Sequence, residues 1–498
     1  MAKPVRTASV RRATRSRGAA VLLAVALLAG CLPLPDVRPA TRPLDAPWRL
    51  APAEVPSWVV RVPGVDVPST PARYDGQTTL RWGLDEPVDT VVIAVPGLFG
   101  GAAQFGPLAR RLVAATPGLQ VWAIDRRANA LEDLAPGREA WASGDAELVR
   151  RAYLGTADAP PSYRAPDPER YAFVADWGLA THLADLDAVV REARAAASHV
   201  VLAGHSLGAS QVALYSAWNG PDRSGRAAID GLVLIDGAPG RTGAFGYSRG
   251  FRLFGVPVVL PTREAVEQGR ASPWTTLGEG GATFARRLAS AMLAAMAPDD
   301  PAPSGAADVP MTNRAFGGIV HDDQYGAFRV HSASLGQARD AELDGNVFAV
   351  LVGGFWAARS GSVVGVAEGA ERVDWGPGDP RYERTDFEEY MRTWTGPYAD
   401  AAEWYVPTAL LLDLAALPPD LTDRDDFVPM REVTTPTLAI GSDRGLLRDV
   451  DAFGGYAEQR LGAPLTVTIL SGLTHVDLLT ADENPLVPLL ARWMTLLP

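Results

Sequence analysis

Ser206 stands at the centre of the run Gly204-His205-Ser206-Leu207-Gly208, which fits the pattern G-x-S-x-G. A serine held in a sharp, strained turn between a strand and a helix exposes its hydroxyl, and side chains at the flanking glycines would collide with both elements. The start of the following helix favours developing negative charge. The run therefore predicts a nucleophilic Ser206, with a turn of small residues as the alternative. His205 is expected to pack beside the serine.

A serine hydroxyl attacks at neutral pH only when a base accepts its proton, and histidine does this best. After Ser206 the chain contains three histidines, His321, His331 and His475. His475 follows the last predicted strand, whereas the other two lie in a long insertion, where a pocket lining or a solvated position is expected.

The base in turn needs a carboxylate to orient it. Asp443 and Asp236 each end a predicted strand. Asp477, two residues beyond His475, is expected to make local hydrogen bonds.

Alternating strands and helices must position these side chains. Short apolar, β-branched runs bounded by turn residues predict buried strands, and apolar residues at helical spacing predict the helices between them. Strands are predicted at 90–95, 120–124, 199–203, 231–235, 437–440 and 465–470, and helices at 103–115, 183–197, 207–218, 451–461 and 486–497. Near-continuous apolar strands that alternate with helices indicate an α/β fold, a mostly parallel sheet covered on both faces.

In this context the chain resembles the α/β-hydrolase superfamily of serine esterases and lipases, over about 80–240 and 431–498. The resemblance implies a nucleophile, acid and base in that chain order and a cap inserted late in the sheet. It implies Ser206 as nucleophile, His475 as base and Asp443 as acid. Asp236 is the alternative acid, because a minority of lipases carry the acid after the strand that follows the nucleophile helix.

The resemblance also implies an oxyanion hole of two backbone N–H groups, which stabilise the charge that develops on the substrate oxygen. One donor is Leu207, directly after the nucleophile. The other is Leu98 in the loop after the first strand of the core, with Phe99 as runner-up. The sequence departs from the family's His-Gly-X loop, because Pro96 stands where the histidine is usual.

A polar run, Asp125-Arg126-Arg127, follows the second predicted strand beside the expected cleft. A network of salt bridges is the favoured interpretation, and a polar wall that contacts substrate is the alternative.

Composition excludes several other classes of protein. The chain has 498 residues, of which 47% are hydrophobic and 21% charged, as in ordinary globular proteins. Six of the 46 bases precede residue 31, so the remainder has 40 bases against 58 acids, a formal charge of −18. Such an acidic body is unsuited to nucleic acid. One cysteine, six histidines and the lack of a dinucleotide or phosphate-loop motif predict no metal and no cofactor.

The N-terminus has the pattern of a bacterial lipoprotein signal peptide. Basic residues precede the apolar run 19–30, which is too short for a transmembrane helix, and the only cysteine, Cys31, follows it at once. We expect residues 1–30 to be removed and Cys31 to carry lipid, which would anchor the protein to a membrane of the cell envelope, outside the cytoplasm. Ten prolines in 31–71 predict an extended tether, and partial docking on the domain is the alternative.

The predicted organisation is a core at 72–240 with an insert at about 126–178, a cap at 241–430 and a second core segment at 431–498. The expected function is hydrolysis of carboxylic esters, with a small-molecule or lipid ester as substrate. The alternatives are an amidase, a thioesterase, or a catalytically silent binding protein on the same scaffold. Aromatic residues in 241–430 predict a cap that lines an apolar pocket.

Overall fold

The computed structural model describes residues 51–498 apart from 157, 221–228, 240–250, 254–255, 259, 277–279, 305–308, 327–328, 345–361, 396–400, 418–420, 422–423 and 461–462. The predicted signal peptide and Cys31 lie outside the described residues. Among the helices described, none is both long and apolar enough to cross a membrane.

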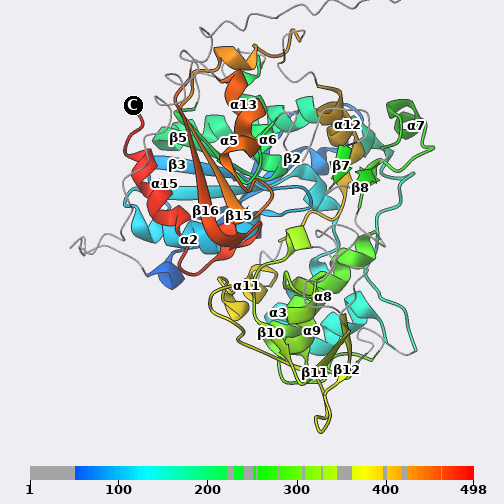
Figure 1. The fold of residues 1–498 in the computed structure, drawn as a ribbon. Coiled ribbons are helices and arrows are strands. Elements are labelled where there is room, and N and C mark those ends of the chain that lie inside the picture. The colour runs from blue at the N-terminus through cyan, green and yellow to red at the C-terminus, as the bar shows by residue number, and fades with distance from the viewer. Residues whose placement is uncertain are drawn as a thin grey trace, which may run out of the picture. The chain divides into compact units, whose positions relative to one another are not determined.

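An eight-stranded sheet in the order β1-β2-β4-β3-β5-β6-β15-β16 forms the centre of the protein (Figure 1). Pairing is antiparallel at β1–β2 and β2–β4 and parallel elsewhere. The strands are β1 (Ser57–Pro63), β2 (Gly76–Trp82), β3 (Val88–Val95), β4 (Leu119–Asp125), β5 (Ala197–His205), β6 (Gly231–Ile235), β15 (Thr437–Arg444) and β16 (Leu465–Thr474). The predicted α/β-hydrolase fold, a mostly parallel sheet flanked by helices, is confirmed.

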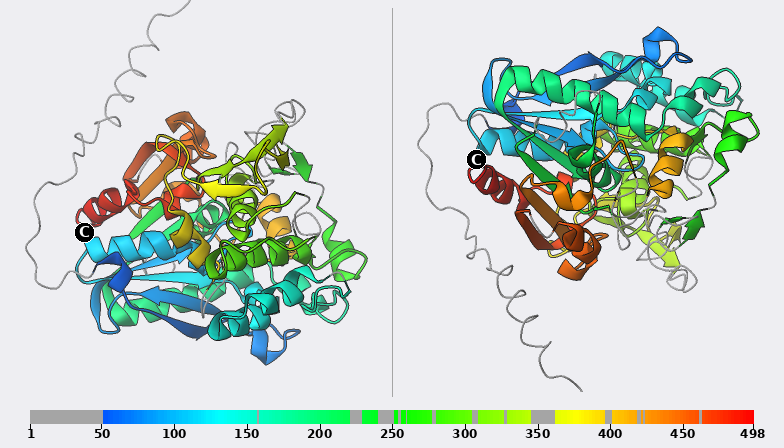
Figure 2. Two further views of the ribbon diagram at one scale, coloured as in Figure 1. Left: turned by 90° about the horizontal axis from the view of Figure 1, so that it is seen from below. Right: turned by 90° about the horizontal axis from the view of Figure 1, so that it is seen from above.

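Helices cover both faces of this sheet. In Figures 1 and 2, α2 and α15 lie side by side on one face, and α5 and α6 lie on the other. These helices are α2 (Gly106–Ala115), α5 (Leu179–Ala196), α6 (Leu207–Ala217), α13 (Gly454–Gln459), α14 (Asp477–Thr480) and α15 (Leu486–Met494). All residues of α6 are buried. The apolar β-branched strands and this fully buried helix make the core from which the nucleophile turn projects.

The core begins earlier than predicted. Ser57–Pro63, within the expected tether, is strand β1 and pairs with β2 along its whole length. Pro63, the one proline of β1, does not prevent this, because an edge strand needs hydrogen bonds on one side only. The tether prediction is therefore wrong for the described part of 31–71, and the docking alternative is correct there.

The two insertions form accessory structure and pack on each other. The first contains η4 (Arg127–Leu131), α3 (Ala135–Ser143), α4 (Ala146–Val149), η5 (Arg150–Leu154) and η6 (Ala172–Asp176). The second contains β7 (Phe251–Leu253), β8 (Val256–Val258), α7 (Arg263–Glu267), β9 (Trp274–Thr275), α8 (Gly281–Met296), α9 (Asn313–His321), η7 (Arg329–His331), β10 (Gln337–Arg339), β11 (Ala341–Asp344), β12 (Ser362–Val366), β13 (Asp374–Gly376), α11 (Phe387–Thr393), β14 (Val406–Pro407) and α12 (Thr408–Ala416). Helix α8 contacts α9 and α11 and also α3, α4 and η5 of the first insertion.

Candidate active site

Ser206 occupies a strained turn between β5 and α6. Its φ of 55° and ψ of −118° lie outside the regions that side chains prefer. A β-carbon on Gly204 would come within 2.2 Å of the Gly208 carbonyl oxygen, and one on Gly208 within 2.1 Å of the Val95 carbonyl oxygen. Ser206 is partly exposed, whereas His205 is buried. The predicted strand–turn–helix context is present, and both glycines are required by close backbone approach.

His475 directly follows β16 and pairs with Asp236, the residue that follows β6. The distance from His475 Nδ1 to Asp236 Oδ2 is 2.6 Å, and both side chains are buried. Asp236 also accepts hydrogen bonds from the backbone N–H groups of Leu446 and Leu447, both at 2.8 Å. The turn that supplies them needs Gly445, where a β-carbon would lie 2.3 Å from Asp236 Oδ2.

Asp443 does not contact His475, and the prediction of this residue as its partner is wrong. Asp443 is exposed and accepts hydrogen bonds from Ser471 Oγ at 2.6 Å and from the Gly472 N–H at 2.7 Å. The chain after β15 turns so that Leu446 and Leu447 face the end of β6, and their N–H groups bind the carboxylate of Asp236. The alternative acid therefore occupies the place predicted for Asp443.

His205 packs against the base, as predicted. The rings of His205 and His475 lie 4.2 Å apart between centroids, and His205 Nε2 is 3.0 Å from the His475 carbonyl oxygen. Burial lowers the pKa of His205 well below its usual value, and a charge on His475 would lower it further. A carbonyl can only accept, so Nε2 of the neutral ring carries the proton and holds the backbone of the base in place.

His475 packs on His205, the neighbour of Ser206, but in the described structure no hydrogen bond joins the side chains of Ser206 and His475. Among the described residues, Ser206 Oγ has no hydrogen-bond partner. Contacts of this kind are often long without substrate and tighten when it binds.

The loop after β3 lies against the nucleophile. A β-carbon on Gly97 would come within 2.9 Å of the Ser206 Cβ. Phe99 has a φ of 59°, in the left-handed region. The N–H of Leu98 makes no hydrogen bond within the described residues. Leu207 is the first residue of α6, where an N–H has no intrahelical partner, and no side chain caps this helix. In the part of the chain that the structure describes, the N–H groups of Leu98 and Leu207, the two predicted oxyanion donors, therefore have no hydrogen-bond partner.

The two histidines of the long insertion have different surroundings. His321 is fully buried and bonds to Arg287 through both ring nitrogens, at 3.1 Å and 3.0 Å. His331 is partly exposed, and its ring lies 5.9 Å from that of Phe99. The buried part of its ring and the nearby charge of Arg287 lower the pKa of His331 to about 3. His331 is therefore a neutral side chain of the second insertion that lies beside the loop after β3.

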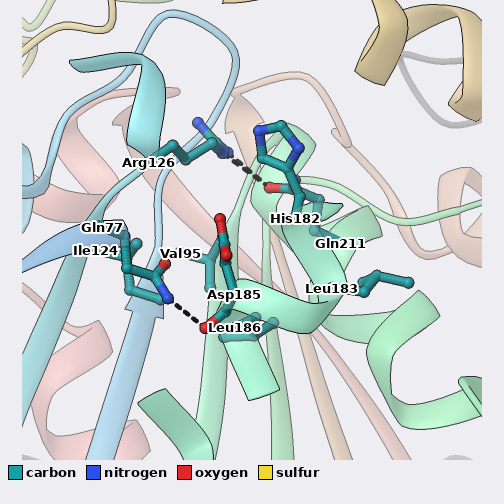
Figure 3. Close-up of a pocket in the computed structure, with 9 residues that line it drawn as sticks. All are labelled: Gln77, Val95, Ile124, Arg126, His182, Leu183, Asp185, Leu186 and Gln211. Carbon is teal, nitrogen blue, oxygen red and sulfur yellow. Dashed lines mark hydrogen bonds between the residues drawn. The ribbon is translucent and has the colours of Figure 1, made fainter. Parts of the chain in front are cut away.

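A small cavity lies between strands β2, β3 and β4 and helices α5 and α6 (Figure 3). Its volume of about 20 Å³ suffices for one water molecule and is far too small for an ester substrate. It is lined by Gln77, Val95, Ile124, Arg126, His182, Leu183, Asp185, Leu186 and Gln211. His182 Nδ1 donates to the Gly178 carbonyl at 2.8 Å, which leaves its buried Nε2 as an acceptor without a partner among the described residues. Burial lowers the pKa of His182 to about 3.

Asp477 joins the loop of the base to the cap. It is buried, and one oxygen accepts from the Thr474 N–H and the Ser334 hydroxyl, at 2.9 Å and 2.8 Å. The other accepts from the Ser334 N–H and the Thr385 hydroxyl, both at 2.9 Å. Asp477 makes the local hydrogen bond that was predicted, and it also binds residues of the second insertion. Within the described residues, no group of His, Cys, Asp and Glu is placed to hold a metal ion.

No protein-family model matches the chain, and no curated protein matches it. Similar solved structures include a candidate lipase from Sulfolobus solfataricus, with 17% identity over 88% of this chain and 93% of that one and a TM-score of 0.48. They also include the epoxide hydrolase VrEH1 from Vigna radiata, with 12% identity, coverages of 89% and 97% and a TM-score of 0.39. A thermophilic esterase from Thermogutta terrifontis has 11% identity, coverages of 88% and 98% and a TM-score of 0.37. At identities and TM-scores this low, the likeness assigns neither a family nor an activity to this chain.

Proposed function

We propose that this protein is a serine hydrolase that cleaves carboxylic esters through Ser206, His475 and Asp236. The observation that carries the proposal is the buried 2.6 Å contact between His475 Nδ1 and Asp236, beside a partly exposed serine in a strained turn. Asp236 accepts only, so Nδ1 of His475 carries a proton and Nε2 is left as the acceptor for the serine proton. This tautomer is the one that a general base needs.

The proposed reaction follows from these positions. Ser206 Oγ attacks the ester carbonyl carbon while His475 Nε2 takes its proton, and the carbonyl oxygen becomes an oxyanion. The N–H groups of Leu98 and Leu207 stabilise this charge. The imidazolium then gives its proton to the departing alcohol, which leaves an acyl group on Ser206. A water molecule, deprotonated by His475, releases the acid and restores the serine.

The substrate that we propose is an ester with an apolar acyl group. Phe99, next to the proposed oxyanion donor, lies 5.6 Å from Phe284 of the cap between ring centroids. Phe284 in turn stacks on Trp404, with a centroid distance of 6.3 Å and an interplanar angle of 16°. These rings join the catalytic loop to an apolar cap. Membrane attachment through lipid on Cys31, in the envelope of a bacterial cell, remains part of the proposal and rests on the sequence.

Labelling with a fluorophosphonate tests the proposal most directly, because only an activated serine reacts with it. We expect wild-type protein to be labelled at Ser206 and to hydrolyse p-nitrophenyl esters, and Ser206→Ala and His475→Ala to lose both properties. A folded wild-type protein that neither reacts nor hydrolyses esters would favour the silent binding protein instead. Matched ester, thioester and amide substrates with one acyl group would distinguish an esterase from a thioesterase or an amidase.

A further inference from the structure

A buried arginine holds the loop that carries the proposed oxyanion donor. All five N–H groups of the Arg126 guanidinium have acceptors. Nη1 donates to the Gly97 carbonyl at 3.2 Å and to Glu403 Oε2 at 2.8 Å. Nη2 donates to the Pro96 carbonyl and to Gln211 Oε1, and Nε donates to the same Gln211 oxygen at 3.2 Å. Because the planar guanidinium has a fixed fork geometry, these partners fix the positions of the Pro96 and Gly97 carbonyls.

The direction of the Gly97 carbonyl determines the direction of the Leu98 N–H. These two groups belong to one peptide unit, and no peptide bond in the described chain is cis. In a trans peptide the C=O and N–H point in opposite directions. The Gly97 carbonyl points to Arg126, so the Leu98 N–H points away from it. This N–H has no partner within the described residues, and Gly97 lies against Ser206.

The second insertion completes this support. Glu403, fully buried, forms the ion pair with Arg126 through its side chain, and its backbone N–H donates to the Phe99 carbonyl at 3.1 Å. The Gly101 N–H donates to the Ala401 carbonyl at 3.1 Å. The loop is therefore held by Arg126 on the core side and by residues 401–403 on the other. In this chain Pro96 stands where the resemblance implied a histidine, and the contacts with Arg126 and residues 401–403 support the loop there.

We propose that Arg126 is a positioning residue, which aims the Leu98 N–H at the developing oxyanion by holding the Gly97 carbonyl. This inference rests on the proposed function. Arg126 itself touches neither the nucleophile nor the base, so its effect passes through the backbone of the loop. Its loss should therefore weaken binding of the transition state and leave binding of the substrate nearly unchanged.

Arg126→Lys tests this role, because lysine keeps the charge opposite Glu403 but cannot hold two carbonyls and Gln211 at once. Misplacement of catalytic groups by about 1 Å costs on the order of 100-fold in rate. We expect kcat for a p-nitrophenyl ester to fall about 30- to 100-fold, with KM within about threefold of wild type. Affinity for a boronic acid, whose adduct with serine is tetrahedral and places an oxygen in the oxyanion hole, should fall by the same factor as kcat/KM.

Arg127→Lys is the matched control. Arg127 is the next residue, equally buried, and pairs with Asp185 at 2.6 Å and 2.7 Å, but it makes no contact with the loop after β3. The Arg127→Lys variant should lose as much thermal stability as Arg126→Lys, and its kcat should stay within about threefold of wild type. If Arg126→Lys does not fold, the double variant Arg126→Gln/Glu403→Gln removes both buried charges and carries the same expectation.

Two results would overturn the inference: an Arg126→Lys enzyme with wild-type kcat, or equal losses of kcat in both lysine variants. A failure of the proposed function looks different, since wild-type protein would then neither hydrolyse the ester nor bind the boronic acid.

Discussion

Replacement of Asp236 by asparagine should disable the base without moving it. Asp236 accepts three hydrogen bonds, one from Leu447 at Oδ1 and two at Oδ2, from Leu446 and from His475. An asparagine has one acceptor oxygen, so an amide NH₂ must face either the backbone turn or the imidazole. If the oxygen stays on Leu447, the amide donates to His475 Nδ1, and the imidazole proton moves to Nε2. His475 can then no longer accept the proton of Ser206.

The expected size of the effect follows from this change of tautomer. In a serine protease with a Ser-His-Asp triad, an asparagine in place of the acid lowers kcat about 10⁴-fold. At about 1.36 kcal/mol for each factor of ten, this is a loss of about 5.4 kcal/mol of transition-state stabilisation. Asp443→Asn should leave kcat within about threefold, because Asp443 is exposed and its partners are Ser471 and Gly472 at the surface.

The assay compares kcat for a p-nitrophenyl ester in wild type, Asp236→Asn and Asp443→Asn, alongside the rate of fluorophosphonate labelling and the thermal unfolding midpoint. We expect labelling of Asp236→Asn to slow with kcat, and its fold to persist. An Asp236→Asn enzyme with near wild-type kcat, together with an inactive Asp443→Asn enzyme, would refute the assignment of the acid.

Three further predictions concern other parts of the chain. Buried His182, with a folded pKa of about 3, stays neutral while the unfolded chain takes up a proton near pH 6.5, so acidification from pH 7 to 5 should cost about 2 kcal/mol of unfolding free energy. Thermal unfolding of His182→Gln should therefore show a weaker dependence on pH over this window. Cys31→Ser should abolish incorporation of a palmitate analogue, and a label that persists would contradict the anchor. Each methylene added to the acyl chain should raise kcat/KM up to about fourfold until the pocket is full, and an enzyme indifferent to chain length would argue against an apolar acyl site.

The repeating core was predictable because its signals are local. An apolar β-branched run such as 90–95 predicts a strand, and the glycines around Ser206 predict a tight turn, from a few neighbouring residues alone. Strand β1 was missed because prolines dominate its segment, and an edge strand tolerates them. Apolar residues in the 241–430 insertion show no clear helical or strand spacing. Its short helices and two-stranded sheets depend on contacts across long stretches of chain.

The choice between the two acids could not be made from position in the chain. Asp236 and Asp443 end neighbouring parallel strands, so both carboxylates belong to the same edge of the sheet. Their difference arises in the turn at 445–447, where a glycine lets the backbone approach Asp236 and two N–H groups bind its carboxylate. A Gly-Leu-Leu run carries no signal for this role, because its function lies in backbone groups that every residue possesses.

The segment 241–430 and the core both contribute residues to the candidate active site. Removal of the segment would therefore affect more than substrate selection. Glu403, within the segment predicted as cap, pairs with Arg126 beneath the oxyanion loop, and its N–H binds that loop directly. Ser334 and Thr385 bind Asp477, two residues after the base. Excision of 241–430 would therefore remove partners of two catalytic loops and leave the buried charges of Arg126 and Asp477 without them, which costs several kcal/mol for each charge. Loss of activity in such a deletion would not show that the cap selects the substrate. Selection by the cap must be separated from support by the cap through substitutions such as Phe284→Ala, which removes the ring contact with Phe99 and leaves these polar contacts in place.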